Sequence, residues 1–170
     1  MRKPHITPID KEIEIPDNKF LVSKTDTRGI IKYANTTFIE ISGYTEKELI
    51  GSNHNIIRHP DMPRAVFKLL WDTIQSGKEF WGYVKNLAKD GSYYWVFAHV
   101  TPSYDTSGTK IIGFHSDRRK PRKEAVLKVS QIYAEIKKAE AKGGLEAGLK
   151  KLNEILETEG KDYAEFVFSI

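Results

Sequence analysis

Cysteine is absent from this sequence of 170 residues. That absence excludes disulfide bonds, thiolate metal sites and cysteine nucleophiles. Long apolar runs are also lacking, since no stretch approaches the 18 or so uncharged apolar residues of a membrane-spanning helix. Residues 1–19 carry charges throughout and have no apolar core of the length that a signal peptide needs. We therefore expect a cytoplasmic protein.

A strong excess of either charge is missing as well. The net charge of +4 arises from 27 basic and 23 acidic residues, and part of the excess lies in residues 118–123. No aromatic residue interrupts this basic run, which follows the last expected strand of the domain, so a solvated linker is favoured over a nucleic-acid surface. With 39% hydrophobic residues, the chain can bury one core and carry a small appendage.

Hydrophobic alternation and turn residues divide the first 119 residues into strands and helices. Strands are expected over 20–25, 30–34, 80–89, 92–104 and 110–117, with turns at 26–29, 90–91 and 105–108. Asn35 is placed to cap a short helix that Gly43 ends, and Thr45 opens a second one with a capping-box pattern. The resulting order is two strands, several helices and three strands, which is typical of an α+β fold.

The stretch from His54 to Trp71 combines polar chemistry with a helical segment. Pro63 suits the first position of a helix, and Asp61 is placed to cap it. Phe67 and Trp71 follow at i and i+4, so they share a face that points back towards residues 58–61. An arginine and a histidine beside a helix start suit an anionic ligand, and a tryptophan suits a flat ring. The alternative is a surface loop with an internal salt bridge.

The ends of the chain differ from the middle. Residues 1–19 contain three prolines among charges, which indicates an arm with at most a short ordered piece. From Glu124 onward apolar residues repeat at helical spacing, and Gly143-Gly144 interrupts the repeat. The two helices form a hairpin or extend away as a dimerising or docking element, and either way their apolar stripe must be buried against something. Residues 163–170 are apolar but too short to classify.

Two sets of motifs resemble a known family. Asn35-Thr36-Thr37-Phe38, Ser42-Gly43-Tyr44 and Glu48-Leu49-Ile50-Gly51 resemble the PAS domain family over residues 20–119. The run Arg58-His59-Pro60-Asp61-Met62-Pro63, followed by Phe67, Trp71, Val84-Lys85-Asn86 and Lys89-Asp90-Gly91-Ser92, resembles the flavin-binding sensor domain of bacterial aerotaxis receptors. The resemblance implies a PAS fold: a five-stranded antiparallel sheet with helices on one face, preceded by an arm over 1–19 and followed by a helical extension over 120–170.

The resemblance also implies an FAD site. Arg58, His59 and Asp61 would hold or shape the pocket, while Phe67 belongs to the same motif and Trp71 would pack against the cofactor. Asn35 and Asn86 would present amides to the isoalloxazine edge; the alternatives are a helix cap for Asn35 and a backbone-satisfied amide for Asn86. His54 is more often a bystander, and core positions are favoured for Phe80, Trp81, Trp95 and Phe97. Without cysteine, the adduct chemistry of light-sensing flavin domains is excluded.

By the same resemblance, the protein is expected to be a non-enzymatic redox sensor for aerotaxis or energy taxis. Unlike such receptors, residues 1–170 contain no membrane anchor or signalling coiled coil, so a separate membrane-bound chemotaxis transducer is the expected partner, with a homodimer as a further option. This transducer would hold the protein at the inner membrane face, and the protein itself would not insert into the membrane. No nucleic-acid partner is expected. The alternatives are a haem sensor using His54, His59 or His99, a sensor of another small ligand, a ligand-free adaptor, or a flavin reductase, although no G-x-G-x-x-G fingerprint is present.

Overall fold

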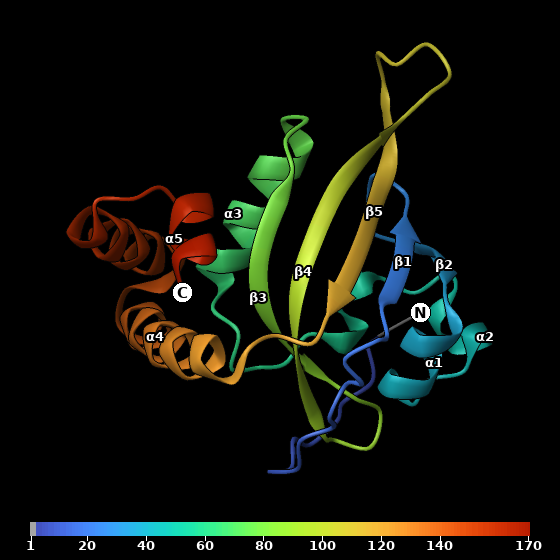
Figure 1. Cartoon of the computed structure of the whole chain (residues 1–170), viewed down its shortest axis with the longest axis horizontal. Helices are drawn as coiled ribbons and strands as arrows, with labels where there is room; N and C mark the ends of the chain where they lie inside the picture. The colour runs from blue at the N-terminus through green and yellow to red at the C-terminus, as the bar shows by residue number, and fades with distance from the viewer. Residues whose placement is uncertain (1–2) are drawn as a thin grey trace.

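A computed structural model describes residues 3–170, and its centre is one antiparallel sheet (Figure 1). The strands are β1 (Leu21–Thr25), β2 (Ile31–Ala34), β3 (Phe80–Leu87), β4 (Tyr93–Tyr104) and β5 (Ile111–Arg119). Their order across the sheet is β2-β1-β5-β4-β3, and each neighbouring pair is antiparallel. The predicted five-stranded sheet is therefore confirmed.

The segment between β2 and β3 supplies the helices that pack on one face of this sheet. They are α1 (Thr36–Ser42), α2 (Glu46–Leu49), the 3-10 turn η1 (His54–Ile57) and α3 (Arg64–Gln75). The Asn35 side chain accepts a hydrogen bond from the Phe38 N–H, and α1 ends at Gly43 in the left-handed conformation (φ 75°). Thr45 and Glu48 form the predicted capping box. These short helices therefore begin and end where their capping residues indicate.

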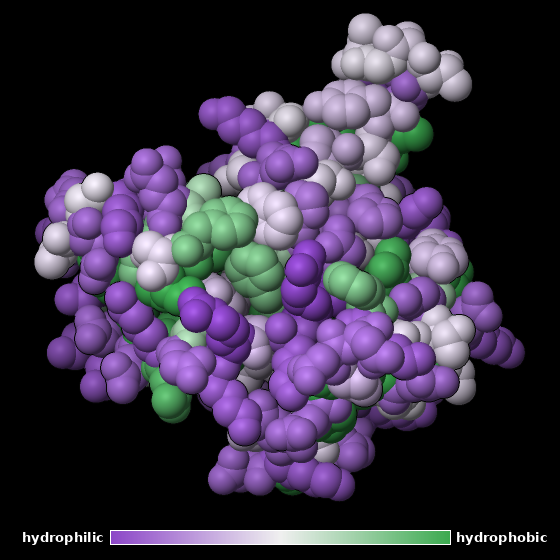
Figure 2. Space-filling model, in the orientation of Figure 1, coloured by the Kyte–Doolittle hydropathy of each residue, from purple (hydrophilic) through white to green (hydrophobic). Residues whose placement is uncertain are grey.

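Alternation along the strands separates a helix-facing side of the sheet from an outer side. Tyr94, Val96 and Ala98 of β4 are buried towards the helices. On the outer side, Trp81 stacks on His99 with ring centroids 3.7 Å apart and lies against Phe97 at 5.6 Å. Figure 2 shows apolar side chains gathered on this side, where α5 meets β3. Phe80, Trp81, Trp95 and Phe97 are packing residues, as predicted.

The start of α3 differs from the prediction. The helix begins at Arg64, one residue after Pro63, and no neighbouring side chain caps it. Instead, the carboxylate of Glu140 accepts hydrogen bonds from the N–H groups of Arg64 and Ala65, at 3.0 and 2.8 Å. The prediction that Asp61 caps this helix is therefore wrong, because the carboxylate of Glu140, 75 residues after Ala65, takes that place.

The C-terminal residues fold back on the domain. Helix α4 (Lys123–Glu159) is broken at Gly144, where φ is 70° and ψ is −162°, so residues 123–143 and 145–159 form two helical segments followed by α5 (Tyr163–Ser169). Helix α4 packs beside α3, and α5 packs against β3 at the edge of the sheet (Figure 1). Val129 and Ile136 are buried there, and the Tyr133 hydroxyl donates to the Tyr83 carbonyl at 2.6 Å. Of the two arrangements expected for these helices, the structure shows the hairpin and not an element that extends away from the domain.

The N-terminal arm is more ordered than expected. The Ile13 N–H donates to the Tyr93 carbonyl at 2.8 Å, and the Tyr93 N–H donates to the Lys11 carbonyl at 2.9 Å. Ile15 is buried in the main core. Backbone pairing with the start of β4 therefore fixes a segment that looked irregular because of its prolines. Among residues 3–170, no helix is long and apolar enough to cross a membrane.

Candidate functional site

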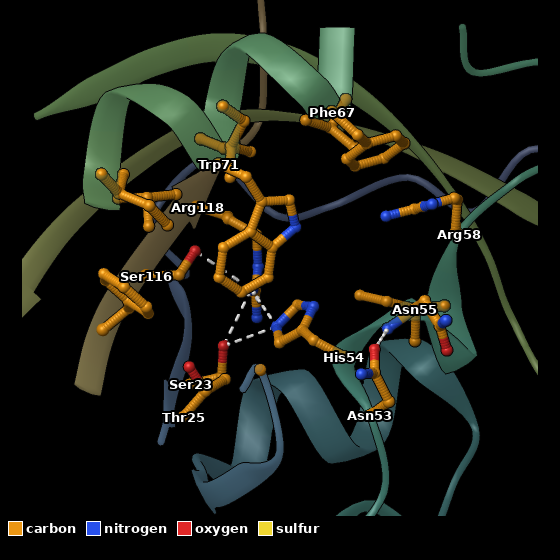
Figure 3. Close-up of a pocket in the computed structure, with 18 of the residues that line it drawn as sticks. Ser23, Thr25, Asn53, His54, Asn55, Arg58, Phe67, Trp71, Ser116 and Arg118 are labelled. Carbon is orange, nitrogen blue, oxygen red and sulfur yellow. Dashed lines mark hydrogen bonds between the residues drawn. The ribbon is translucent and has the colours of Figure 1, made fainter. Parts of the chain in front are cut away.

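A cavity lies between α3, η1 and the helix-facing side of the sheet (Figure 3). It encloses about 770 Å³ of space, its open mouth included. The apolar part of its wall contains Ile57, Phe67, Leu70, Trp71, Ile74, Val84, Val100 and Phe114, and the polar part contains Ser23, Thr25, Asn53, His54, Asn55, Arg58, Asn86, Ser116 and Arg118. No acidic residue belongs to this wall. The site therefore suits a largely apolar ligand that carries hydrogen-bond acceptors.

A buried polar group of the cavity wall is the guanidinium of Arg118 on β5. Its Nη1 donates to the hydroxyl oxygens of Ser23 and Ser116, at 2.9 and 3.1 Å, and lies 3.0 Å from Nε2 of His54. The Ser23 hydroxyl is 2.9 Å from the same Nε2. An arginine can only donate, so Nε2 of His54 must be unprotonated and act as the acceptor.

Burial shifts the ionisation of both groups. Loss of water around the guanidinium lowers the pKa of Arg118 to about 10, with smaller opposing effects from Tyr94 and Asp117. Burial, and then the positive charge of Arg118, lower the pKa of His54 to about 3. At neutral pH the cavity therefore contains a neutral imidazole beside a charged guanidinium.

Several buried donors in the wall have no partner. Within the described chain, Nε and Nη2 of Arg118, Nδ2 of Asn86 and Nε of Arg58 make no hydrogen bond. An unpaired buried donor costs roughly 1–3 kcal/mol, and native proteins contain few of them. Four of the eight buried side-chain atoms without a partner in residues 3–170 line this one space, which favours a ligand that accepts hydrogen bonds here.

The aromatic wall comes from one face of α3. Phe67 and Trp71 lie one helical turn apart, as their spacing predicts. The guanidinium of Arg58 lies over the Phe67 ring, 3.7 Å from its centroid, and Trp71 meets Phe114 edge to face at 5.6 Å. In the β1–β2 turn, Gly29 has φ 81°, and a Cβ there would lie 3.1 Å from the Trp71 ring. Glycine is thus required for the turn to pass beside this tryptophan.

Four of the seven predicted site residues lie together at the cavity: Arg58, Phe67, Trp71 and Asn86. They converge because η1 ends at Arg58, where an isolated bridge pairs its backbone with Asn86 of β3. Figure 3 shows Arg58, Phe67 and Trp71 facing the same space.

The other three predicted residues lie outside the cavity wall. The Asn35 oxygen accepts from the N–H groups of Val22 and Phe38, and its amide donates to the Phe20 carbonyl, so its groups are already used. Nδ1 of His59 accepts from the Asp61 N–H at 3.0 Å, and the Asp61 carboxylate pairs with Lys85 at 2.7 Å. His59 and Asp61 thus shape the loop that follows Arg58.

The sequence interpretation missed Arg118 and the serines beside it. Assigning residues 118–123 to a solvated linker was wrong for Arg118, because β5 continues to Arg119 and the Arg118 side chain is 3% exposed. Alternation from Phe114 through Ser116 to Arg118 could have placed all three on the helix-facing side. Of the three histidines considered for haem, only His54 lies at the cavity.

Comparison with known proteins agrees with this architecture. The family model described as PAS fold matches residues 31–115. The aerotaxis receptor of Escherichia coli (strain K12) is 39% identical over 130 residues, which cover 76% of this chain and 25% of the receptor. The chain thus spans about a quarter of that relative.

Solved structures show the same fold. A light-oxygen-voltage domain studied with a flavin analogue has a TM-score of 0.56 at 22% identity, over 66% of this chain and 85% of that one. The light-state LOV domain of Aureochrome1 has a TM-score of 0.55 at 21% identity, over 72% and 92%. The chain therefore belongs to the PAS family, and its PAS domain is of the aerotaxis-receptor type.

Proposed function

We propose that this domain binds FAD in the cavity and acts as a redox sensor. One observation carries the proposal: an aromatic and aliphatic wall, which contains no carboxylate, surrounds buried donors that have no partner in the described chain. A flavin ring has an apolar benzenoid side and a pyrimidine edge with carbonyl and nitrogen acceptors. The wall therefore offers a surface for each side of such a ring.

Different residues of the wall would contact different parts of the flavin. Trp71 and Phe67 would cover the ring, and the Asn86 amide, which can donate or accept, would meet its polar edge. The Arg118 guanidinium would favour an electron-rich ring, and neutral His54 would hold that guanidinium in place. Bound flavin supplies reversible electron uptake, which changes the charge and hydrogen bonding of the ring. These side chains would thus contact a ring of different charge and hydrogen-bonding capacity in each redox state.

The outer end of the cavity would hold the rest of the cofactor. Asn53 is exposed, and Asn55 and Arg58 are half-buried, so this polar side faces solvent. A cationic guanidinium there suits the phosphates of FAD. Asn35, His59 and Asp61 would act indirectly, by fixing the backbone on either side of the cavity.

The proposed output is aerotaxis or energy taxis without enzymatic turnover. The similarity to the aerotaxis receptor supports this step. A separate membrane-bound chemotaxis transducer would receive the signal and hold the domain at the inner membrane face, or two copies of the domain would act as a homodimer. Because the apolar stripe of α4 packs on its own domain, a partner would contact the exposed side of these helices or the region they cover.

The first experiment is a near-ultraviolet and visible absorbance spectrum of the purified protein, before and after reduction with dithionite. Two flavin bands that bleach are expected, and chromatography of the heat-released cofactor should identify FAD. Trp71→Ala should give folded but colourless protein. The matched control is Trp81→Ala, since Trp81 lies on the outer side of the sheet and this variant should remain yellow. A haem band in place of the flavin bands, or equal flavin content in both variants, would contradict the proposal.

A further inference from the structure

The start of α3 depends on a residue from the C-terminal extension. Both carboxylate oxygens of Glu140 are used there, one by the Arg64 N–H and the other by the Ala65 N–H. The Glu140 side chain is almost fully buried. A carboxylate at this end of a helix satisfies two free donors and meets the positive end of the helix dipole. Glu140 therefore fixes the position of the α3 N-terminus.

The hairpin itself clamps Glu140 in place. The reversal at Gly144 brings residues 145–159 back against residues 123–143, and Gly148 then lies beside Glu140. A Cβ on Gly148 would lie 2.5 Å from Cγ and 2.6 Å from Oε2 of Glu140. The carboxylate thus fits only because this position has no side chain. Three segments meet at one group: α3 and both arms of the hairpin.

The helix that Glu140 fixes also forms the cavity wall. Phe67 and Trp71 lie within the first two turns after Arg64 and Ala65. Because helical hydrogen bonds make these turns one stiff element, a displacement of the aromatic wall moves the amides that Glu140 binds. A displacement of the hairpin moves the wall in the same way.

We propose that Glu140 is a positioning residue that couples the cavity to the C-terminal hairpin. Docking of residues 123–170 fixes the aromatic wall, and a change at the wall loosens or tightens that docking. The coupling is reciprocal, as linkage between two sites requires. The identity of the ligand rests on the proposed function, under which a change in flavin redox state would act through this contact on the surface seen by a partner.

Hydrogen exchange of the full-length chain tests the contact. Glu140→Gln keeps the shape but leaves one oxygen acceptor for two donors, so the Arg64 and Ala65 amides should exchange about tenfold faster, as expected for one lost hydrogen bond. The matched control is Glu135→Gln on the same helix, because the exposed Glu135 carboxylate has only Lys151 at 3.8 Å. Amides of β1 and β2 report global unfolding. Unchanged exchange at Arg64 and Ala65 in Glu140→Gln would overturn the proposal.

Gly148→Ala provides a second variant. Alanine forms helices better than glycine, so intrinsic propensity predicts a tighter hairpin. The contact with Glu140 predicts the opposite: faster exchange at Arg64 and Ala65. If the amides of the hairpin become more protected and those of Arg64 and Ala65 remain as protected as in the wild type, the proposed contact between Gly148 and Glu140 is refuted.

A cavity variant tests the coupling without any flavin. Phe67→Leu changes the cavity wall. In the otherwise wild-type protein it should alter the hydrogen exchange of the amides in residues 145–159, whereas in the Glu140→Gln variant it should leave their exchange unchanged. An equal change in both backgrounds, or none in the wild type, would reduce Glu140 to a structural cap and overturn the coupling. Colourless protein would instead refute the flavin proposal and leave this test unaffected.

Discussion

Replacement of Arg118 by methionine should stabilise the ligand-free protein and weaken flavin binding. Burial lowers the pKa of Arg118 from its ordinary value to about 10, which corresponds to roughly 3 kcal/mol against the charged form in the folded state. The change removes three hydrogen bonds, to the Ser23 and Ser116 hydroxyls and to Nε2 of His54, each contributing about 0.5–1 kcal/mol, while Ser23 retains His54 as a partner. The free energy of unfolding should therefore rise by about 1 kcal/mol.

Urea unfolding of the flavin-free protein measures the first effect, and quenching of flavin fluorescence on binding measures the second. Loss of a hydrogen bond from a charged donor should weaken binding about tenfold or more. Arg119→Met is the matched control, because the adjacent side chain is exposed and lies over the Phe20 ring at 5.3 Å. It should change both quantities little. If Arg118→Met lowered the free energy of unfolding by more than about 1 kcal/mol, Arg118 would be a residue that stabilises the fold. If flavin affinity were unchanged, Arg118 would not belong to the binding site.

Two further predictions concern pH and the hairpin. Because the pKa of His54 is about 3 in the folded protein and near 6.5 when unfolded, the unfolded chain alone binds this proton between those values. Acidification should therefore lower the free energy of unfolding by up to about 1.4 kcal/mol per pH unit, and His54→Gln should flatten that slope in urea unfolding at a series of pH values; an equally steep slope in the variant would contradict this. Ile136→Ala, at a fully buried position of α4, should lower stability by about 2–5 kcal/mol, whereas Leu127→Ala on the exposed side of the same helix should change it little. Equal effects would contradict a hairpin that shares the main core.

Features set by neighbouring residues could be predicted from the sequence. Asn35, Gly43 and Thr45 act on donors and acceptors within four residues, so the short helices begin and end where expected. Phe67 and Trp71 share a face because helical spacing requires it, whatever lies opposite. Alternation likewise indicated all five strands.

Features set by distant residues could not be predicted in this way. Nothing near Pro63 indicates that the cap of α3 is Glu140, since the two meet only after the hairpin has folded back. The prediction for Asp61 failed for the same reason: Lys85 of β3 attracts that carboxylate away from the helix start. Arg118 was missed because a basic run normally indicates solvent, although its own strand alternation pointed inward.

The two buried charges that were missed differ in a way that distinguishes packing from function. Both carboxylate oxygens of Glu140 are satisfied by the structure itself, at a helix end that favours a negative charge, so Glu140 needs no ligand. Arg118 retains two buried nitrogens without a partner and has no carboxylate within the cavity wall. Replacement of an incompletely paired buried charge by a well-packed apolar group is often neutral or stabilising, so the fold alone does not require Arg118. The incomplete satisfaction of Arg118 and Asn86 is therefore the stronger evidence for a bound acceptor, and the opposed effects expected for Arg118→Met on stability and flavin affinity follow from it.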